Sequence, residues 1–195
     1  MMWFLSRFML IVFFMASLGC AGGIEAGSTV AASPKNCATT ENLIEDSHFQ
    51  LLADGPWLYT QHTGERSFQL DSENGGLKMS RISGQPWMVV RQEIRHPKLD
   101  GATLTFSAEL RSETSATPTI HGFEHIAGLF LQPGNNAISA SVAEHTPNVG
   151  VWDWAPFSVE KRVPAGTLSA KVGFVHQAGG TLWARNPVLL LTYCD

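Results

Sequence analysis

Residues 157–193 read FSVEKRVPAGTLSAKVGFVHQAGGTLWARNPVLLLTY. Apolar residues take every second position in three extended runs, which are separated by Pro164-Ala165-Gly166 and by Gly179-Gly180. Such alternation is typical of strands that bury one face, and proline and glycine at the breaks are typical of turns. The stretch therefore predicts three consecutive antiparallel strands that close a β-sandwich at its C-terminal end.

The same alternation continues through the middle of the chain. Leu104, Phe106 and Leu110 share one side of their run, whereas Glu109 and Arg111 share the other, so this strand has a core face and a polar face. No apolar 3.6-residue period of useful length follows residue 19. The expected class is all-β, a two-sheet antiparallel β-sandwich over residues 42–195. Further strands are expected at 67–71, 76–82, 87–95, 102–113, 126–132, 138–144 and 154–163.

The N-terminal segment is predicted to direct export. One positive charge precedes an apolar run at 8–18 that is too short for a membrane span, so residues 1–19 are interpreted as a signal peptide. Ser17-Leu18-Gly19-Cys20 resembles a bacterial lipobox with two positions interchanged, and lipidation of Cys20 is the prediction. Cleavage after Ala21 and a permanent membrane anchor are the alternatives. Residues 20–41, rich in small residues, are expected to form a flexible tether.

An exported protein meets an oxidising compartment, in which disulfides persist. Cys20 apart, the chain has Cys37 and Cys194, and a β-sandwich commonly brings its two ends together. A Cys37–Cys194 disulfide is therefore predicted, with two free thiols as the alternative. The expected location is the bacterial cell envelope, lipid-anchored, or the medium.

Composition limits the partners. The 195 residues include 15% charged and 44% hydrophobic residues, which is typical of one globular domain. The formal net charge of −4 gives no reason to expect nucleic acid, which attracts basic surfaces.

Seven segments occur in an order that is similar to a known family. They are NLIEDSHFQ at 42–50, Trp57, WMVVRQEI at 87–94, LTFSAELR at 104–111, WAPF at 154–157, VPAG at 163–166 and GTLW at 180–183. This order resembles carbohydrate-binding modules of the galactose-binding-like jelly-roll fold, the type appended to xylanases and cellulases. The resemblance implies a jelly roll, no cofactor, and a polysaccharide or oligosaccharide as partner.

The resemblance also implies that a structural calcium site of many members is lost. Gln50 and Arg185 or Asn186 stand where those members have carboxylates, and Ca²⁺ prefers carboxylate oxygens. No metal is therefore expected, and Glu45 or Asp46 is expected to pair with Arg185 instead.

Sugar binding needs aromatic surfaces for pyranose C–H bonds and polar groups for hydroxyls. Trp87, Arg91, Glu109 and Arg111 fall on the polar side of two runs expected to be neighbouring strands, with Trp152 at their rim. We expect these five residues to form a weak glycan-binding face. The alternative is that the charged residues form cross-strand ion pairs. Trp57, Trp154 and Trp183 are expected in the core.

Catalysis is not expected. His121-Gly122-Phe123-Glu124-His125 matches an inverted zinc-protease motif, but that motif needs a helix, which Pro118 and Gly122 disfavour. A polysaccharide lyase using Glu109, Arg111 and His176 is the weaker alternative, and a structural or adhesion lipoprotein is the stronger one. An open groove lined by Trp and Arg favours glycan binding, whereas a flat face of paired charges favours adhesion.

Overall fold

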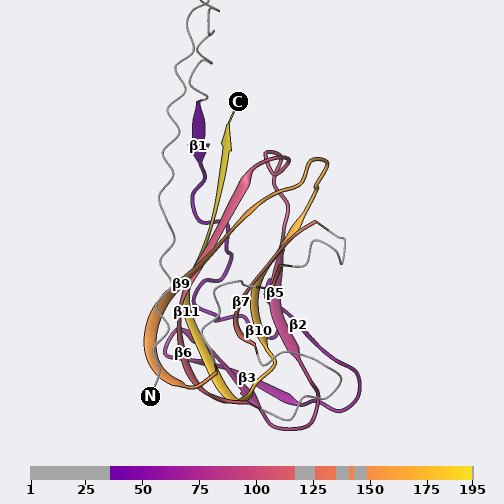
Figure 1. Ribbon diagram of the computed structural model, residues 1–195, viewed down its shortest axis with the longest axis vertical. Coiled ribbons are helices and arrows are strands. Elements are labelled where there is room, and N and C mark those ends of the chain that lie inside the picture. The colour runs from indigo at the N-terminus through magenta and orange to yellow at the C-terminus, as the bar shows by residue number, and fades with distance from the viewer. Residues whose placement is uncertain (1–35, 117–125, 135–140, 143–148, 195) are drawn as a thin grey trace, which may run out of the picture. The chain divides into compact units, whose positions relative to one another are not determined.

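The computed structural model describes residues 36–116, 126–134, 141–142 and 149–194, of which none is helical. The described residues contain eleven strands (Figure 1). They are β1 (Cys37–Thr39), β2 (Leu58–Gln61), β3 (Phe68–Glu73), β4 (Gly76–Arg81), β5 (Met88–Ile94), β6 (Thr103–Ser115), β7 (Ala127–Pro133), β8 (Ser141–Val142), β9 (Val151–Arg162), β10 (Ala170–His176) and β11 (Gly179–Cys194).

The strands form two antiparallel sheets. Sheet A has the order β3-β4-β11-β6-β9, and β1 pairs with the end of β11. Sheet B has the order β2-β5-β10-β7-β8. The expected two-sheet antiparallel β-sandwich is confirmed. β1 lies within the segment that was expected to be tether, and β2 is a strand that sequence analysis did not predict.

The core lies between the sheets because each strand turns alternate side chains inward. In β6 the inward residues, Leu104 to Thr114 by twos, are buried, and the outward ones are partly or fully exposed. Phe174 is fully buried, with ring centroids of Phe49, Trp57 and Phe106 within 5.7 to 6.1 Å of its own. Trp57, with 4% of its surface exposed, is a core residue as predicted.

A two-residue turn, Asn74-Gly75, joins β3 to β4. Asn74 and Gly75 both have positive φ, at 52° and 73°, which a two-residue hairpin of the favoured type requires. Asparagine and glycine adopt this conformation at little cost, so the local sequence sets the register of this hairpin.

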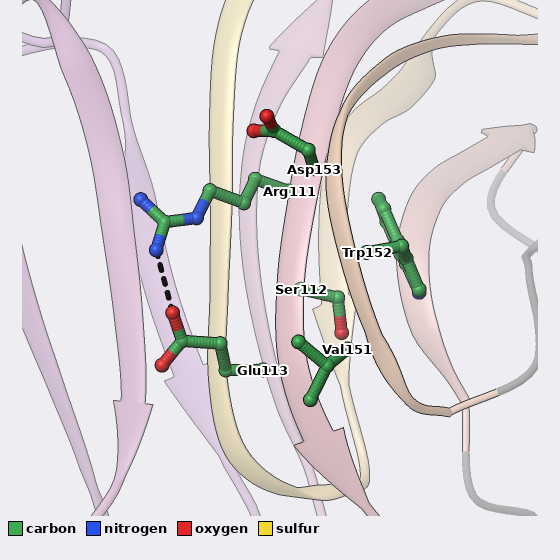
Figure 2. A pocket seen from close by; sticks show the side chains of 6 residues that line it. All are labelled: Arg111, Ser112, Glu113, Val151, Trp152 and Asp153. Atoms are coloured by element: carbon green, nitrogen blue, oxygen red, sulfur yellow. Dashed lines mark hydrogen bonds and ion pairs between the residues drawn. The ribbon is translucent and has the colours of Figure 1, made fainter.

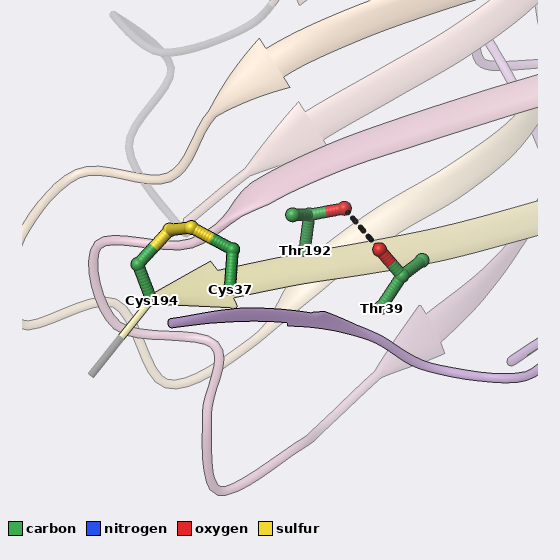
Figure 3. Close-up of a disulfide and its surroundings, with 4 residues drawn as sticks. All are labelled: Cys37, Thr39, Thr192 and Cys194. Carbon is green, nitrogen blue, oxygen red and sulfur yellow. Dashed lines mark hydrogen bonds between the residues drawn. A yellow bond between two sulfur atoms is a disulfide. The ribbon is translucent and has the colours of Figure 1, made fainter. Parts of the chain in front are cut away.

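The disulfide between Cys37 and Cys194 is present, as predicted (Figure 3). It joins the first residue of β1 to its partner at the end of β11, across a sequence separation of 157. Two residues further into this pair, the hydroxyls of Thr39 and Thr192 are hydrogen-bonded at 3.0 Å.

Several predictions lie outside the described residues. They are the signal peptide at 1–19, the lipidated Cys20, the motif from His121 to His125 and most of the expected strand at 138–144. No helix among the described residues is long and apolar enough to cross a membrane.

His176 is the one fully buried imidazole among the described residues. His176, at the end of β10, contacts the Phe68 ring at 5.5 Å, and its Nε2 lies 3.2 Å from the carbonyl oxygen of Gly180. Its Nδ1 is buried without a hydrogen-bond partner. Burial is the main cause that lowers the pKa of His176 from 6.5 to about 4; the hydrogen bond to Gly180 opposes this shift, and the nearby Arg81 guanidinium adds to it.

Candidate functional site

The structure divides the five predicted site residues between the two sheets. Arg91 is part of β5 and Trp87 immediately precedes that strand, so both belong to sheet B. Glu109, Arg111 and Trp152 belong to sheet A. The expectation that β5 and β6 are neighbours was wrong, so these residues do not share one face.

The reason lies in the connection between the two strands. Hydrogen bonds from Leu99 N to His96 O and from Ala102 N to Leu99 O form two successive turns, and both Leu99 and Ala102 are buried. The link therefore carries the chain from one sheet to the other, instead of folding β6 back beside β5 as a short hairpin would.

Two of the five residues, Arg111 and Trp152, line a cleft of about 460 Å³ between β6 and β9 (Figure 2). The β6–β9 pairing shifts register between Leu110 and Ser112, and the cleft opens beside this irregularity. It is lined by Arg111, Ser112, Glu113, Val151, Trp152 and Asp153.

Polar and apolar groups alternate around this cleft. Arg111 Nη2 lies 2.5 Å from Glu113 Oε1, and the guanidinium carbon of Arg111 lies 4.6 Å from the ring centroid of Trp183. Trp152 points away from Arg111 (Figure 2) and packs against Phe157 at 5.3 Å, with its Nε1 buried and without a hydrogen-bond partner. Val151 is 82% exposed. The cleft thus offers the Arg111 guanidinium and the carboxylates of Glu113 and Asp153 to a polar ligand.

The other outward side chains of sheet A are largely paired with one another. Glu109 accepts hydrogen bonds from Arg185 and Asn186 on the neighbouring strand, and these bonds hold the pKa of Glu109 below its ordinary value. Arg185 therefore pairs with Glu109, and the expected pairing with Glu45 or Asp46 was wrong. On this face the alternative of cross-strand ion pairs is realised.

Two tryptophans expected in the core lie on this outward face instead. Trp154 and Trp183 are half-buried. The Arg185 guanidinium carbon lies 4.2 Å from the Trp154 ring centroid, and Lys78 Nζ lies 6.0 Å from that of Trp183. These cation–π contacts cover indole surface that a sugar ring would otherwise use.

The outward side of sheet B, termed the outer face of sheet B, differs from that of sheet A. Its described residues are Trp87, Val89, Arg91 and Glu93 along β5, Leu58 and Thr60 on β2, Lys171, Gly173 and Val175 on β10, and Gly128, Phe130 and Gln132 on β7. Trp87 is half-buried and meets His62 edge-on at 6.0 Å. Arg91 Nη1 is buried without a hydrogen-bond partner.

This face contains apolar side chains that do not belong to the core. Phe130 and Val175 are 9% and 2% exposed, yet neither is part of the cluster of buried residues between the sheets. Leu58, directly across from Arg91 on β2, is 50% exposed. Sequence analysis missed these residues, because the run from Ala127 to Leu131 is apolar on both faces and so lacks alternation.

No known protein family and no curated protein matches this sequence. The fold is similar to solved structures. The enzymatically active domain of tailspike protein 4 from bacteriophage CBA120 matches with a TM-score of 0.52 and 15% identity, covering 76% of this chain and 21% of that one. The carbohydrate-binding module CBM4 matches at 0.51 and 13% identity, covering 78% and 99%.

A CBM61 module in complex with β-1,4-galactotriose matches with a TM-score of 0.50 and 11% identity, covering 77% of this chain and 98% of that one. At such identities the likeness concerns the fold alone. The jelly-roll β-sandwich of carbohydrate-binding modules, expected from the order of segments, is therefore confirmed as the fold of this chain.

Proposed function

We propose that this chain is an exported, non-catalytic module that binds a glycan on the outer face of sheet B. The observation that carries the proposal is the accessible apolar and aromatic surface on that face, which Leu58 and Trp87 form. Leu58 is 50% exposed and the Trp87 indole is half-buried, so both offer surface to pyranose C–H bonds, whereas Phe130 and Val175 are 9% and 2% exposed and do not. Ligand sites typically combine such apolar surface with a few polar groups on a rigid scaffold.

The predicted residues on sheet A enter the proposal as a second contact region. Arg111, Glu113 and Trp152 line the cleft, where the Arg111 guanidinium and the Glu113 carboxylate are the groups offered to sugar hydroxyls. Glu109 supports this region through its bonds to Arg185 and Asn186, which hold the polar residues of neighbouring strands in place.

The proposal includes export and a lipid anchor at Cys20. The Cys37–Cys194 disulfide fits an oxidising compartment outside the cytoplasm. The lipobox-like Ser17-Leu18-Gly19-Cys20 supports attachment of the domain to a membrane through the segment before β1.

A structural or adhesion lipoprotein is the second candidate, and the outer face of sheet A favours it. That face carries the paired charges Arg111–Glu113, Arg185–Glu109 and Lys78–Glu73. The lyase alternative has less support, because His176 is fully buried and Glu109 is engaged by Arg185. Neither group is placed to exchange a proton with a substrate.

The test is affinity electrophoresis of the exported full-length protein in gels that contain single polysaccharides, after a glycan array has selected them. Trp87→Ala should abolish retardation and leave the thermal midpoint within ~2 °C. The matched control is Trp154→Ala, because Trp154 is a half-buried indole on the outer face of sheet A. It should keep the wild-type retardation.

Two results would count against this assignment. A large fall in the thermal midpoint of Trp87→Ala would identify Trp87 as a packing residue. Retardation that survives Trp87→Ala and disappears in Trp152→Ala would move the binding site to the cleft.

A further inference from the structure

Building on the proposed function, we infer that the cleft between β6 and β9 holds a second glycan chain, so that each molecule joins two polysaccharide chains. The groups around the cleft are accessible, and the cleft lies diagonally across the sandwich from Leu58 and Trp87. One linear chain that follows one surface of the domain does not contact both places.

The cleft has the size and the accessible groups that a sugar residue needs. Its volume of about 460 Å³ falls within the usual range for ligand sites. The side chains of Arg111 and Glu113 are 40% and 50% exposed, and Asp153 is exposed as well. The guanidinium donates to sugar hydroxyls and the carboxylates accept from them. Val151, which is 82% exposed, adds apolar surface for C–H bonds.

Arg111 is held in position from two sides. Glu113 Oε1 accepts from its Nη2 at 2.5 Å, and the ring centroid of Trp183 lies 4.6 Å from its guanidinium carbon. This bond to Glu113 is the one hydrogen bond that Arg111 makes with the described residues. Because a guanidinium has five N–H donors, others remain for a ligand. A sugar therefore meets a donor that is ordered before binding, which lowers the entropic cost of association.

The two proposed regions face away from each other. The cleft opens on the outward side of sheet A, whereas Leu58 and Trp87 lie on the outer face of sheet B. β9 is an edge strand of sheet A and packs against β7, which lies three strand spacings, ~14 Å, from β2 in sheet B. The two sheets are themselves ~10 Å apart. A chain would have to fold around the sandwich to reach both regions, so each region takes its own chain.

The cleft is the weaker of the two regions. Its most exposed apolar side chain is Val151, and the Trp183 indole is covered by the Arg111 guanidinium. Sheet B offers a larger apolar surface through Trp87 and Leu58. Retardation in a gel therefore depends on sheet B, in accord with the loss expected for Trp87→Ala. The cleft engages a second chain because a polysaccharide presents many sugar residues at a high local concentration.

The test measures whether the protein joins polysaccharide chains. Soluble xylan, β-glucan and galactan are mixed with the exported full-length protein, and the hydrodynamic radius is followed by light scattering. The protein carries Cys20→Ala, so that acyl chains cannot join copies. With a polysaccharide that retards the protein, we expect the radius to rise about twofold or more and to fall again in protein excess, when each chain is coated separately.

Arg111→Gln should remove the rise in radius while retardation is retained, because it weakens the cleft about tenfold, the scale of one charge-assisted hydrogen bond. Lys78→Gln is the matched control. Lys78 also pairs with a carboxylate, Glu73 at 3.7 Å, and also contacts the Trp183 ring, but it does not line the cleft. It should keep both the retardation and the rise. Val151→Ser, at an exposed position where substitution leaves the fold intact, should also reduce the rise.

The outcomes separate this inference from the proposed function. Retardation without any rise in radius overturns the second site and leaves glycan binding on sheet B intact. A rise that survives Arg111→Gln overturns the assignment of the second chain to the cleft. Retardation by no polysaccharide overturns the proposed function, and the second chain with it.

Discussion

Acidification from pH 7 to pH 5 should destabilise this protein through His176. The folded-state pKa of His176 is about 4 because burial disfavours the charged ring, whereas the ordinary value is 6.5. The neutral ring can donate from Nε2 to Gly180, and it leaves Nδ1 without a proton. Protonation would place an N–H on the buried Nδ1 where no described residue accepts it, beside the Phe68 ring and in the field of Arg81.

The sign follows from linkage. The unfolded chain binds the proton at a higher pH than the folded protein does, so the contribution of His176 to stability is complete above pH 6.5 and is lost as pH falls toward 4. With these two pKa values the free energy of unfolding decreases by about 2 kcal/mol between pH 7 and pH 5, and by about 3 kcal/mol at pH 4.

The assay is urea unfolding at pH 7, 6 and 5, followed by tryptophan fluorescence, for the wild type and for His176→Gln and His176→Phe. Both variants are expected to be less stable at pH 7 and to lose most of the pH dependence. The lowered pKa values of Glu93 and Glu109 act below 4.5 and so leave this window undisturbed. Equal slopes in the wild type and both variants would refute the reasoning.

Three further predictions concern the ends and the sheets. Replacing Cys37 and Cys194 together by serine should lower the free energy of unfolding by at most about 5 kcal/mol in the chain-entropy model for a sequence separation of 157, and an unchanged urea midpoint would contradict this. Gly173→Ala should lower the free energy of unfolding by about 1–3 kcal/mol or more, because its Cβ would meet the backbone of β5. Gly84→Ala is the control, since its Cβ would meet nothing within 4 Å, and thermal unfolding of both variants should show it nearly neutral. Cys20→Ala should abolish palmitate labelling and release the protein from the membrane fraction, and unchanged partitioning would favour simple secretion.

Local patterns in the sequence predicted most strands, and they could not assign the strands to sheets. The alternation in β9, β10 and β11 records which side chains are buried, because one face of each strand packs against the other sheet. It holds no information about which distant strand lies alongside. For this reason Trp87 and Arg91 were placed correctly on an outward face and incorrectly beside Glu109 and Arg111.

The positions of Trp183 and Trp154 show the same limit. Tryptophan is usually well buried, which favoured the core for both residues. Their outward position depends on cations from other strands, such as Arg111 directly across from Trp183 in the β6–β11 register. The pairing of these distant strands brings the guanidinium over the indole, which is why Trp183 lies half-exposed on the outward face. The local sequence around Trp183 does not contain this information. The short strands β1 and β2, of three and four residues, are likewise defined by their partners.

The disulfide also has a mechanical consequence. Cys37 and Cys194 lie near the first and the last of the described residues in sequence, and their sulfur atoms are covalently joined. A pulling force that acts along the chain from both sides of the domain enters at one cysteine and leaves at the other through this bond. The residues between them, with every hydrogen bond of both sheets, are then outside the path of the load. Tension on the segment before β1 can therefore be transmitted past the domain without shearing its strands.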